Sequence, residues 1–206
     1  MKIETFVTGI IGTNTYLGIN ENTGEAVLVD PAACPKKLLS YIHEEKIQVK
    51  AILLTHGHFD HIMGIDEFRD HYKVPVYVGE NEKELICDAH WNQSDIYTNG
   101  YVFRDAIYVK DQEVLNIAGF SFQVFHTPGH TPGGVCYYEA AEKILFSGDT
   151  LFCNSVGRTD FEGGSMSDLI RGIKEKLIPL PDDTKVLPRH MNATTIGHER
   201  KYNPFL

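Results

Sequence analysis

The stretch AILLTHGHFDH, Ala51–His61, joins an apolar run directly to a cluster of metal-binding side chains. The run AILL is short and wholly apolar, as expected of a β-strand that is buried on both faces. Imidazole and carboxylate groups suit zinc, iron or manganese. The loop after the strand offers four such groups within six residues, namely His56, His58, Asp60 and His61.

Alternate side chains of a loop that leaves a strand can face different sides. His56 and His58 would then face one ion, and Asp60 and His61 would face a second ion. The competing interpretation is a solvated polar loop with a chance run of histidines. That interpretation gives no structural reason for three histidines at this place, so we favour a metal-binding loop.

Two other segments repeat the pattern of an apolar strand followed by a ligand-type residue. FSFQVFHTPGHTPGG contains an alternating strand, then a Pro-Gly turn that ends at His130. KILFSGDT contains a strand, then a glycine and Asp149. Each motif alone is weak, because a turn histidine or a capping aspartate is common. Their repetition supports His130 and Asp149 as further ligands.

The remaining pattern predicts an α/β fold of two packed sheets flanked by helices. IETFVTG, NTYLGI and EAVLVD are typical of strands that turns pair together, and VPVYV and TKVLP of later strands. Apolar residues at helical spacing predict a helix over Lys36–Lys46. Another helix, with Ser167 as its cap, would carry Leu169, Ile173 and Leu177. Residues 88–105 show little periodicity and predict a long loop.

Composition bounds the class of protein. The chain has 206 residues and a formal net charge of −9, with 42% apolar and 23% charged residues. This length suits one domain over residues 1–206, and the acidic balance argues against nucleic acid or an anionic membrane as a partner. No run approaches the ~18 apolar residues of a membrane span. Four scattered cysteines without a C-x-x-C pair, and no signal peptide, predict a cytoplasmic protein with free thiols.

THGHFDH, TPGHTPGG, FSGDTLF and the later His190 together resemble the metallo-β-lactamase superfamily. GDTLFCNSVGRTD and ATTIGHERKYNPFL resemble its short, glyoxalase II-like (hydroxyacylglutathione hydrolase-like) members. The resemblance covers nearly the whole chain. It implies an αββα sandwich, two mixed sheets flanked by helices, with metals at one edge between the sheets.

The resemblance also implies a ligand set for two divalent metal ions per chain. Zinc is the first expectation, and iron and manganese suit the same donors. Asp30, at the end of EAVLVD, matches an aspartate that supports the metal loop. The implied first site is His56, His58 and His130, the second is Asp60, His61 and His190, and Asp149 bridges the two.

Such a centre would hold a hydroxide between the ions, which attacks a carbonyl carbon while Asp60 orients it. The family resemblance implies a small-molecule hydroxyacyl thioester, such as S-lactoylglutathione, as substrate. Arg158 falls where longer relatives carry a basic residue that contacts glutathione. The chain ends soon after His190, without the helical domain that completes the glutathione site in those relatives. A thioester is therefore better supported than glutathione as its thiol.

The segment around His190 departs from the family pattern Pro-Gly-His-Gly, because Arg189 and Met191 replace both glycines. Glycine permits positive φ and close backbone approach, so a shifted loop and a weaker second site are one expectation. The other is that Arg189 supplies a positive group near substrate carboxylates.

Several alternatives stay open at this point. One is a persulfide dioxygenase with a single iron on His56, His130 and Asp149. Another is a metal-binding module without catalytic activity. A β-lactamase is less favoured, because no secretion signal is visible. The aromatic residues of the loop at 88–105 would form a lid or pack on the core; these are Trp91, Tyr97, Tyr101 and Phe103.

Overall fold

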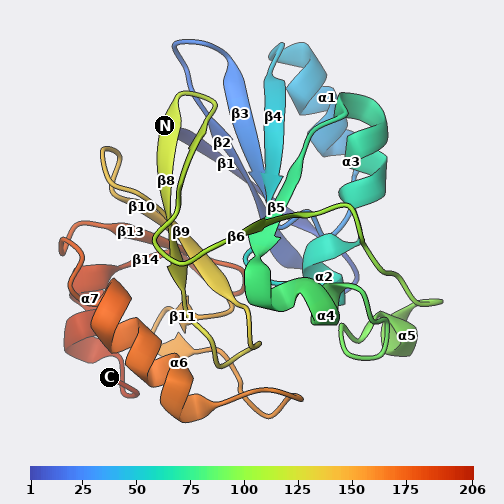
Figure 1. Cartoon of the computed structure of the whole chain (residues 1–206). Coiled ribbons are helices and arrows are strands. Elements are labelled where there is room, and N and C mark those ends of the chain that lie inside the picture. Colours follow the sequence, from blue (N-terminus) through green and yellow to red (C-terminus); the bar gives the residue numbers. More distant parts are fainter.

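The computed structural model describes residues 1–206 and contains two six-stranded sheets packed face to face (Figure 1). In the first sheet, β1, β2 and β3 pair antiparallel, whereas β3 to β6 run parallel. Its strands follow chain order: β1 (Lys2–Thr8), β2 (Thr13–Ile19), β3 (Glu25–Val29), β4 (Gln48–Leu53), β5 (Val76–Gly79) and β6 (Ile107–Val109).

The second sheet is also mixed, because β10 and β13 pair in parallel and the other neighbours antiparallel. Its order is β14 (Thr194–Thr195), β13 (Lys185–Pro188), β10 (Ile144–Gly148), β9 (Val135–Glu139), β8 (Phe120–His126) and β7 (Val114–Ile117). A small separate ribbon joins β11 (Leu151–Phe152) to β12 (Ser155–Val156).

Helices cover the outer face of each sheet (Figure 1). On the first sheet these are α1 (Lys36–Glu44) and α3 (Ile65–Tyr72). On the second they are α6 (Met166–Gly172), which continues as a π-helical turn over Ile173–Leu177, and α7 (Ile196–Tyr202). Three short helices lie near one end of the sheets: α2 (Phe59–Ile62), α4 (Lys83–Ile86), preceded by a 3₁₀ turn at Glu80–Glu82, and α5 (Ser94–Tyr97). The predicted sandwich of two mixed sheets flanked by helices is confirmed.

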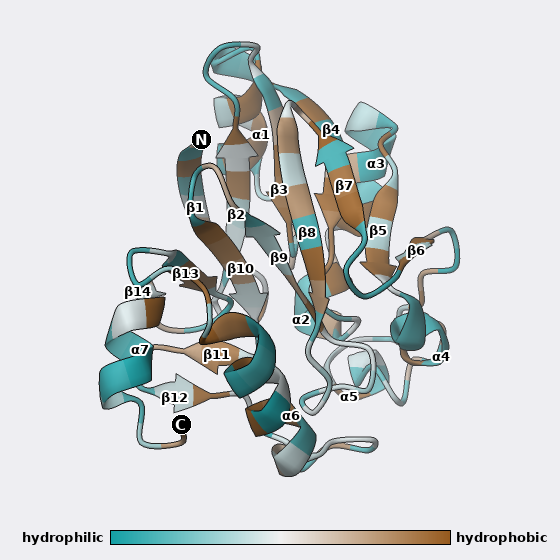
Figure 2. Cartoon of the chain, turned by 60° about the vertical axis from the view of Figure 1, so that its left-hand side comes forward, coloured by the Kyte–Doolittle hydropathy of each residue, from teal (hydrophilic) through white to brown (hydrophobic).

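Alternation along the strands produces three apolar cores, one for each interface between layers. In β3, Leu28 packs toward α1, whereas Val27 and Val29 pack against the second sheet. In β10, Phe146 faces the first sheet and Leu145 faces α6. The apolar colouring of the central strands follows this arrangement (Figure 2). Both sheets are therefore buried on both faces over most of their length.

Several local predictions need correction. The predicted cap Ser167 lies inside α6, and Ser165 is the cap, because its Oγ accepts the Asp168 backbone N–H at 3.3 Å. The predicted loop at 88–105 contains the short helix α5. The segment after β13 adds β14 and α7, which the apolar pattern did not indicate. None of the helices combines the length and apolar character that crossing a bilayer requires.

Candidate metal centre

All the proposed ligands meet at one end of the sandwich, between the two sheets. The loop after β4, together with α2, brings His56, His58, Asp60 and His61 from the first sheet. The second sheet contributes from three strand ends: His130 follows β8, Asp149 follows β10 directly, and His190 follows β13. Strands buried on both faces fix the direction of each loop, so residues 134 positions apart in sequence (from 56 to 190) share one site.

Three imidazole nitrogens converge in the first half of the site. His58 Nδ1 lies 3.0 Å from His56 Nε2 and 3.0 Å from His130 Nε2. These rings meet edge to face and are almost fully buried. Three nitrogen lone pairs this close can be held by one cation.

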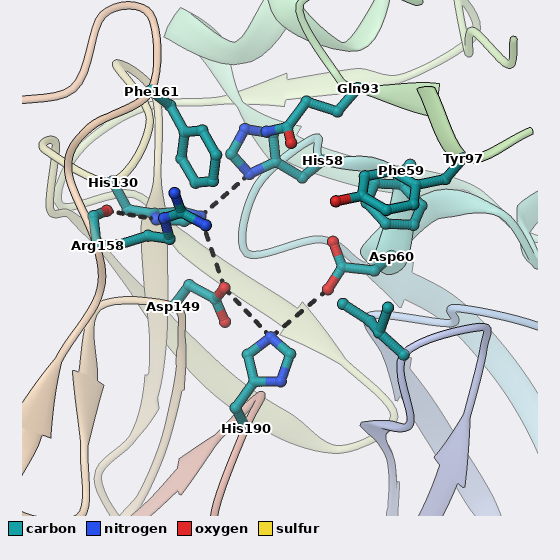
Figure 3. A pocket seen from close by; sticks show the side chains of 11 residues that line it. His58, Phe59, Asp60, Gln93, Tyr97, His130, Asp149, Arg158, Phe161 and His190 are labelled. Atoms are coloured by element: carbon teal, nitrogen blue, oxygen red, sulfur yellow. Dashed lines mark hydrogen bonds and ion pairs between the residues drawn. The ribbon is translucent and has the colours of Figure 1, made fainter. Parts of the chain in front are cut away.

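The second half joins Asp60, His61 and His190 around Asp149. Figure 3 shows His190 between Asp60 and Asp149. His190 Nε2 lies 3.6 Å from one oxygen of Asp60 and 3.6 Å from one of Asp149. His61 Nε2 lies 3.7 Å from each of the same two carboxylates. Tetrahedral coordination with bonds of about 2.1 Å would place ligand atoms roughly 3.4 Å apart. The observed spacing is close to that value.

Asp149 lies between the two halves. Its Oδ2 is 3.5 Å from His130 Nε2, and its Oδ1 faces His61. Burial opposes ionisation, but the interaction with His190 and the charges of His61 and His130 outweigh it and hold the pKa of Asp149 below its usual value. The preceding Gly148 has a φ of +51°, and a Cβ there would overlap the Thr55 hydroxyl. This glycine therefore lets β10 deliver Asp149 against the first sheet.

Outer hydrogen bonds orient two of the histidines. His61 Nδ1 lies 3.1 Å from Asp30, whose carboxylate also accepts the backbone N–H and the hydroxyl of Thr55 at 2.8 Å each. His130 Nδ1 donates to the Arg158 carbonyl at 2.8 Å. A proton on Nδ1 leaves Nε2 as an acceptor facing the site, which is the arrangement that metal-binding histidines require.

The donor set fits divalent cations. His61 Nε2 and Asp149 Oδ1 are buried and have no hydrogen-bond partner, an arrangement that is costly unless another group satisfies them. Burial also lowers the pKa of His56, His58 and His130, so these rings are neutral at pH near 7. Neutral imidazole and ionised carboxylate are the forms that bind metals.

A buried carboxylate that the sequence did not single out links the two histidine-bearing loops. Glu82 is 0% exposed and accepts the backbone N–H of Gly57 at 2.9 Å and of Gly133 at 2.8 Å. Burial raises its pKa, although these hydrogen bonds oppose the shift. Its sequence context, GENEKEL, reads as an exposed polar helix. Only Gly57 and Gly133, which permit a close approach of the two loops, could have indicated in the sequence that a side chain is buried between them.

The sequence model of the Metallo-beta-lactamase superfamily matches residues 8–190 of the chain. The chain belongs to this superfamily. It is 36% identical to "Hydroxyacylglutathione hydrolase GloC" of Haemophilus influenzae, over 100% of the chain and 98% of that protein. Among solved structures, the BLEG-1 B3 metallo-β-lactamase is 40% identical with a TM-score of 0.93, over 99% of both chains. TTHA1623, solved in a di-iron-bound form, is 33% identical with a TM-score of 0.85, over 98% of this chain and 100% of that one.

Arg189, which replaces a glycine of the superfamily pattern, does not face the substrate side. Its side chain is 1% exposed and points beneath the metal loop, where it donates to the carbonyls of Asn14, Asp30 and Asp60. The expectation that it contacts substrate is therefore wrong, because the side chain is buried and both terminal nitrogens of its guanidinium donate to backbone carbonyls. Met191 takes a φ of +69°, the conformation that glycine would adopt. The altered loop still places His190 beside Asp60 and Asp149.

A cavity of about 150 Å³ opens above the metal centre, as Figure 3 shows. Phe161 packs against His58 and His130 at ring distances of 5.0 and 5.4 Å. Arg158 lies at the rim, where its exposed guanidinium covers the Phe161 ring at 4.3 Å and pairs with Asp160. The cavity is lined by Ile11, His58, Phe59, Asp60, Gln93, Tyr97, His130, Asp149, Arg158, Phe161 and His190.

The aromatic residues of the loop at 88–105 divide between the two expected roles. Tyr97 stacks on Phe59 at 4.3 Å and lines the cavity. Phe103 is buried in the core under α3, and Tyr101 packs against the same core. Trp91 lies farther out and donates to the Glu162 carbonyl at 3.2 Å. The loop is thus anchored by its core residues and presents Tyr97 to the site.

Proposed function

We propose that this chain is a metal-dependent hydrolase that cleaves the carbonyl–sulfur bond of a small hydroxyacyl thioester of the S-lactoylglutathione type. The observation that carries the proposal is the donor set: two groups of ligands share Asp149 at the floor of an open cavity. Similarity to the hydrolase GloC supports the reaction class. A di-iron-bound relative supports two ions per chain.

Two divalent cations held by these residues would supply a hydroxide nucleophile at neutral pH and Lewis acidity for the developing oxyanion. The chain's own side chains would orient the nucleophile and line the substrate cavity. Asp60 reaches the cavity and lies beside His190, so its carboxylate can accept a hydrogen bond from the attacking water. Phe161 and Tyr97 contribute apolar parts of the cavity wall, against which an acyl group can pack.

We propose that Arg158 binds the thiol portion of the substrate. Its side chain is 64% exposed at the cavity rim, and its partner Asp160 is equally exposed. An exposed ion pair of this kind contributes little stability, so a substrate carboxylate can replace Asp160 at low cost. We infer that Arg158 favours anionic thiols such as glutathione.

β-Lactam hydrolysis is the second candidate, because BLEG-1 carries that designation and shares 40% identity over almost the full chain. A hydroxide supplied by the metal ions could also attack the amide carbonyl of a β-lactam, and the ions would stabilise the oxyanion that forms. The two candidates differ in the leaving group, which is a thiolate in one and a ring nitrogen in the other.

One preparation can test these proposals. Metal content is measured by mass spectrometry, and turnover is measured on S-lactoylglutathione, on an acyl thioester of a neutral thiol and on a chromogenic β-lactam. We expect two ions per chain and fastest turnover of the glutathione thioester. Arg158→Ala should raise KM for that thioester only, whereas Arg171→Ala, at another exposed arginine that pairs with Asp168, should not. One iron per chain with oxygen consumption on a persulfide would contradict the hydrolase.

A further inference from the structure

Two buried charged side chains contact the metal loops without reaching the cavity. Glu82 is 0% exposed and lies in the 3₁₀ turn before α4. Arg189 is 1% exposed and follows β13. Neither makes a salt bridge within 4 Å. Their shortest hydrogen bonds go to backbone groups, and Arg189 Nε has no partner. Burying a charge is unfavourable unless hydrogen bonds or an opposite charge compensate for the lost hydration.

Glu82 contacts the backbone of the first half of the site. Gly57, whose N–H it accepts, stands between His56 and His58. Gly133, its second donor, lies in the turn that follows His130. A Cβ at Gly133 would overlap the Glu82 backbone nitrogen, so this turn packs directly against the helix that carries the carboxylate. One carboxylate therefore sets the separation of the loops that carry all three histidines.

Arg189 contacts the backbone of the second half. Its guanidinium donates to the carbonyl of Asp60 and, at 2.7 Å, to that of Asp30, which in turn holds His61. It also donates to Asn14. The backbone N–H of Arg189 donates at 3.0 Å to the carbonyl of Gly148, the residue before Asp149. The planar fork of arginine can hold several carbonyls at fixed angles, which a lysine ammonium cannot do.

We propose that Glu82 and Arg189 are positioning residues that act separately, Glu82 on the three-histidine half of the centre and Arg189 on the half formed by Asp60, His61 and His190. The inference rests on the ligand assignment made above. Each residue acts through backbone hydrogen bonds, so each affects the affinity of one ion more than that of the other.

The test measures zinc affinity in two backgrounds that each retain one half of the centre. His58→Ala leaves the half with His190, and His190→Ala leaves the half with three histidines. A chromophoric chelator competes for zinc. Arg189→Met should weaken zinc binding about 10- to 100-fold in the His58→Ala background, and by less than about threefold in the His190→Ala background. Glu82→Gln should show the opposite pattern.

Matched surface variants control for the change of charge. Glu84, two residues from Glu82, is exposed, and Arg171 pairs only with Asp168 on the surface. Glu84→Gln and Arg171→Met should leave zinc affinity unchanged in both backgrounds. Arg189→Lys keeps the charge without the fork, and we expect it to recover only part of the lost affinity.

The outcomes separate two kinds of failure. If the unaltered protein does not bind two zinc ions, the ligand assignment itself is wrong. If it binds two, but each variant weakens both halves equally or neither, the inference is wrong. Loss of folding in both Arg189→Met and Arg189→Lys, or in both Glu82→Gln and Glu82→Asp, would also overturn it, because a positioning role leaves the fold intact.

Discussion

His190 depends on the residues that flank it. Arg189 ties the loop to three segments of the first sheet, and Met191 turns the chain with a left-handed φ of +69°. After His190, Met191 therefore has the backbone conformation that glycine favours. Before His190, the buried Arg189 holds the loop by hydrogen bonds. Arg189 and Met191 stand where the resemblance implies glycines, and with them the loop still holds His190 in the site.

Met191→Gly should stabilise the protein. A side chain in the left-handed region costs about 1–2 kcal/mol, and glycine loses roughly 0.5–1 kcal/mol of extra chain entropy on folding. Met191 is 58% exposed, so little packing is lost. We expect the free energy of unfolding to rise by up to about 1 kcal/mol in urea titrations. The control Met166→Gly, at an exposed helical methionine, should lower it instead.

His190→Ala should remove one ion and most activity while the fold survives. The His190 side chain is 32% exposed, so its loss leaves only a small cavity. The second ion would keep Asp60, His61 and the shared Asp149, so it would lose one of four ligands and bind less tightly. Metal analysis should give one ion per chain, and kcat should fall about 100-fold or more.

His198→Ala is the matched control for that variant. His198 is also partly exposed, but it bonds Asn154 outside the cavity. Both ions and full activity should remain. Unchanged metal content in His190→Ala would show that its loop is not part of the metal centre.

At the scale of elements, the N-terminus of α6 is fixed by its cap and by the metal loop. Ser165 caps the helix, and its backbone N–H donates to Gly129 at 2.8 Å, next to His130. Ser165→Ala should lower the free energy of unfolding by about 1 kcal/mol, since one helix N–H loses its partner. Ser167→Ala should change it by a few tenths at most. Equal effects of the two substitutions in thermal or urea unfolding would reject the assignment of the cap.

The sequence predicted the longer apolar strands better than it predicted the short elements. β4, β8 and β10 are runs of apolar or alternating residues, and burial on two faces leaves a strong signal in composition. β14 and α7 are short and polar, and they depend on contacts with Asp182 and Thr184 rather than on their own pattern. Local sequence carries no sign of such contacts.

The same limit explains the missed and misassigned charges. In the sequence, Glu82 and Arg189 look like ordinary charged surface residues. Only their packing against loops from distant segments shows that they are buried. Conversely, four ligand-type residues within six positions leave few other interpretations. The sequence therefore indicated the candidate ligands of the centre. The residues that hold the ligand loops, Glu82 and Arg189, are recognised only from tertiary contacts.

At the scale of the whole molecule, the buried histidines make stability depend on pH. Burial holds the pKa of His56, His58 and His130 below the ordinary value of about 6.5. As the pH falls past about 6.5, the unfolded chain takes up protons that the folded chain refuses, so the metal-free protein loses stability by up to about 1.4 kcal/mol per pH unit for each histidine. His190 has the opposite dependence, because its hydrogen bond with Asp149 raises its pKa. Its contribution to stability is present at low pH and is lost as the pH rises through that pKa.

Urea unfolding of chelator-treated protein between about pH 7.5 and 5.5 measures this effect. The metal-loaded protein should show a weaker dependence near neutrality, because cations hold the rings deprotonated. A metal-free protein equally stable at both ends of the range would contradict the expected burial of these rings.

The uneven division of the ligands between the sheets has a consequence for folding kinetics. His56, His58, Asp60 and His61 lie close together in the loop after β4 and in α2, whereas His130, Asp149 and His190 come from three separate segments of the second sheet. The local loop can capture a cation early, because closing a short loop costs little entropy, before the second sheet has docked. A cation held at once by ligands of both halves would have to exchange some of them before the sandwich could close. Refolding in excess zinc should therefore be slower than refolding without metal followed by loading.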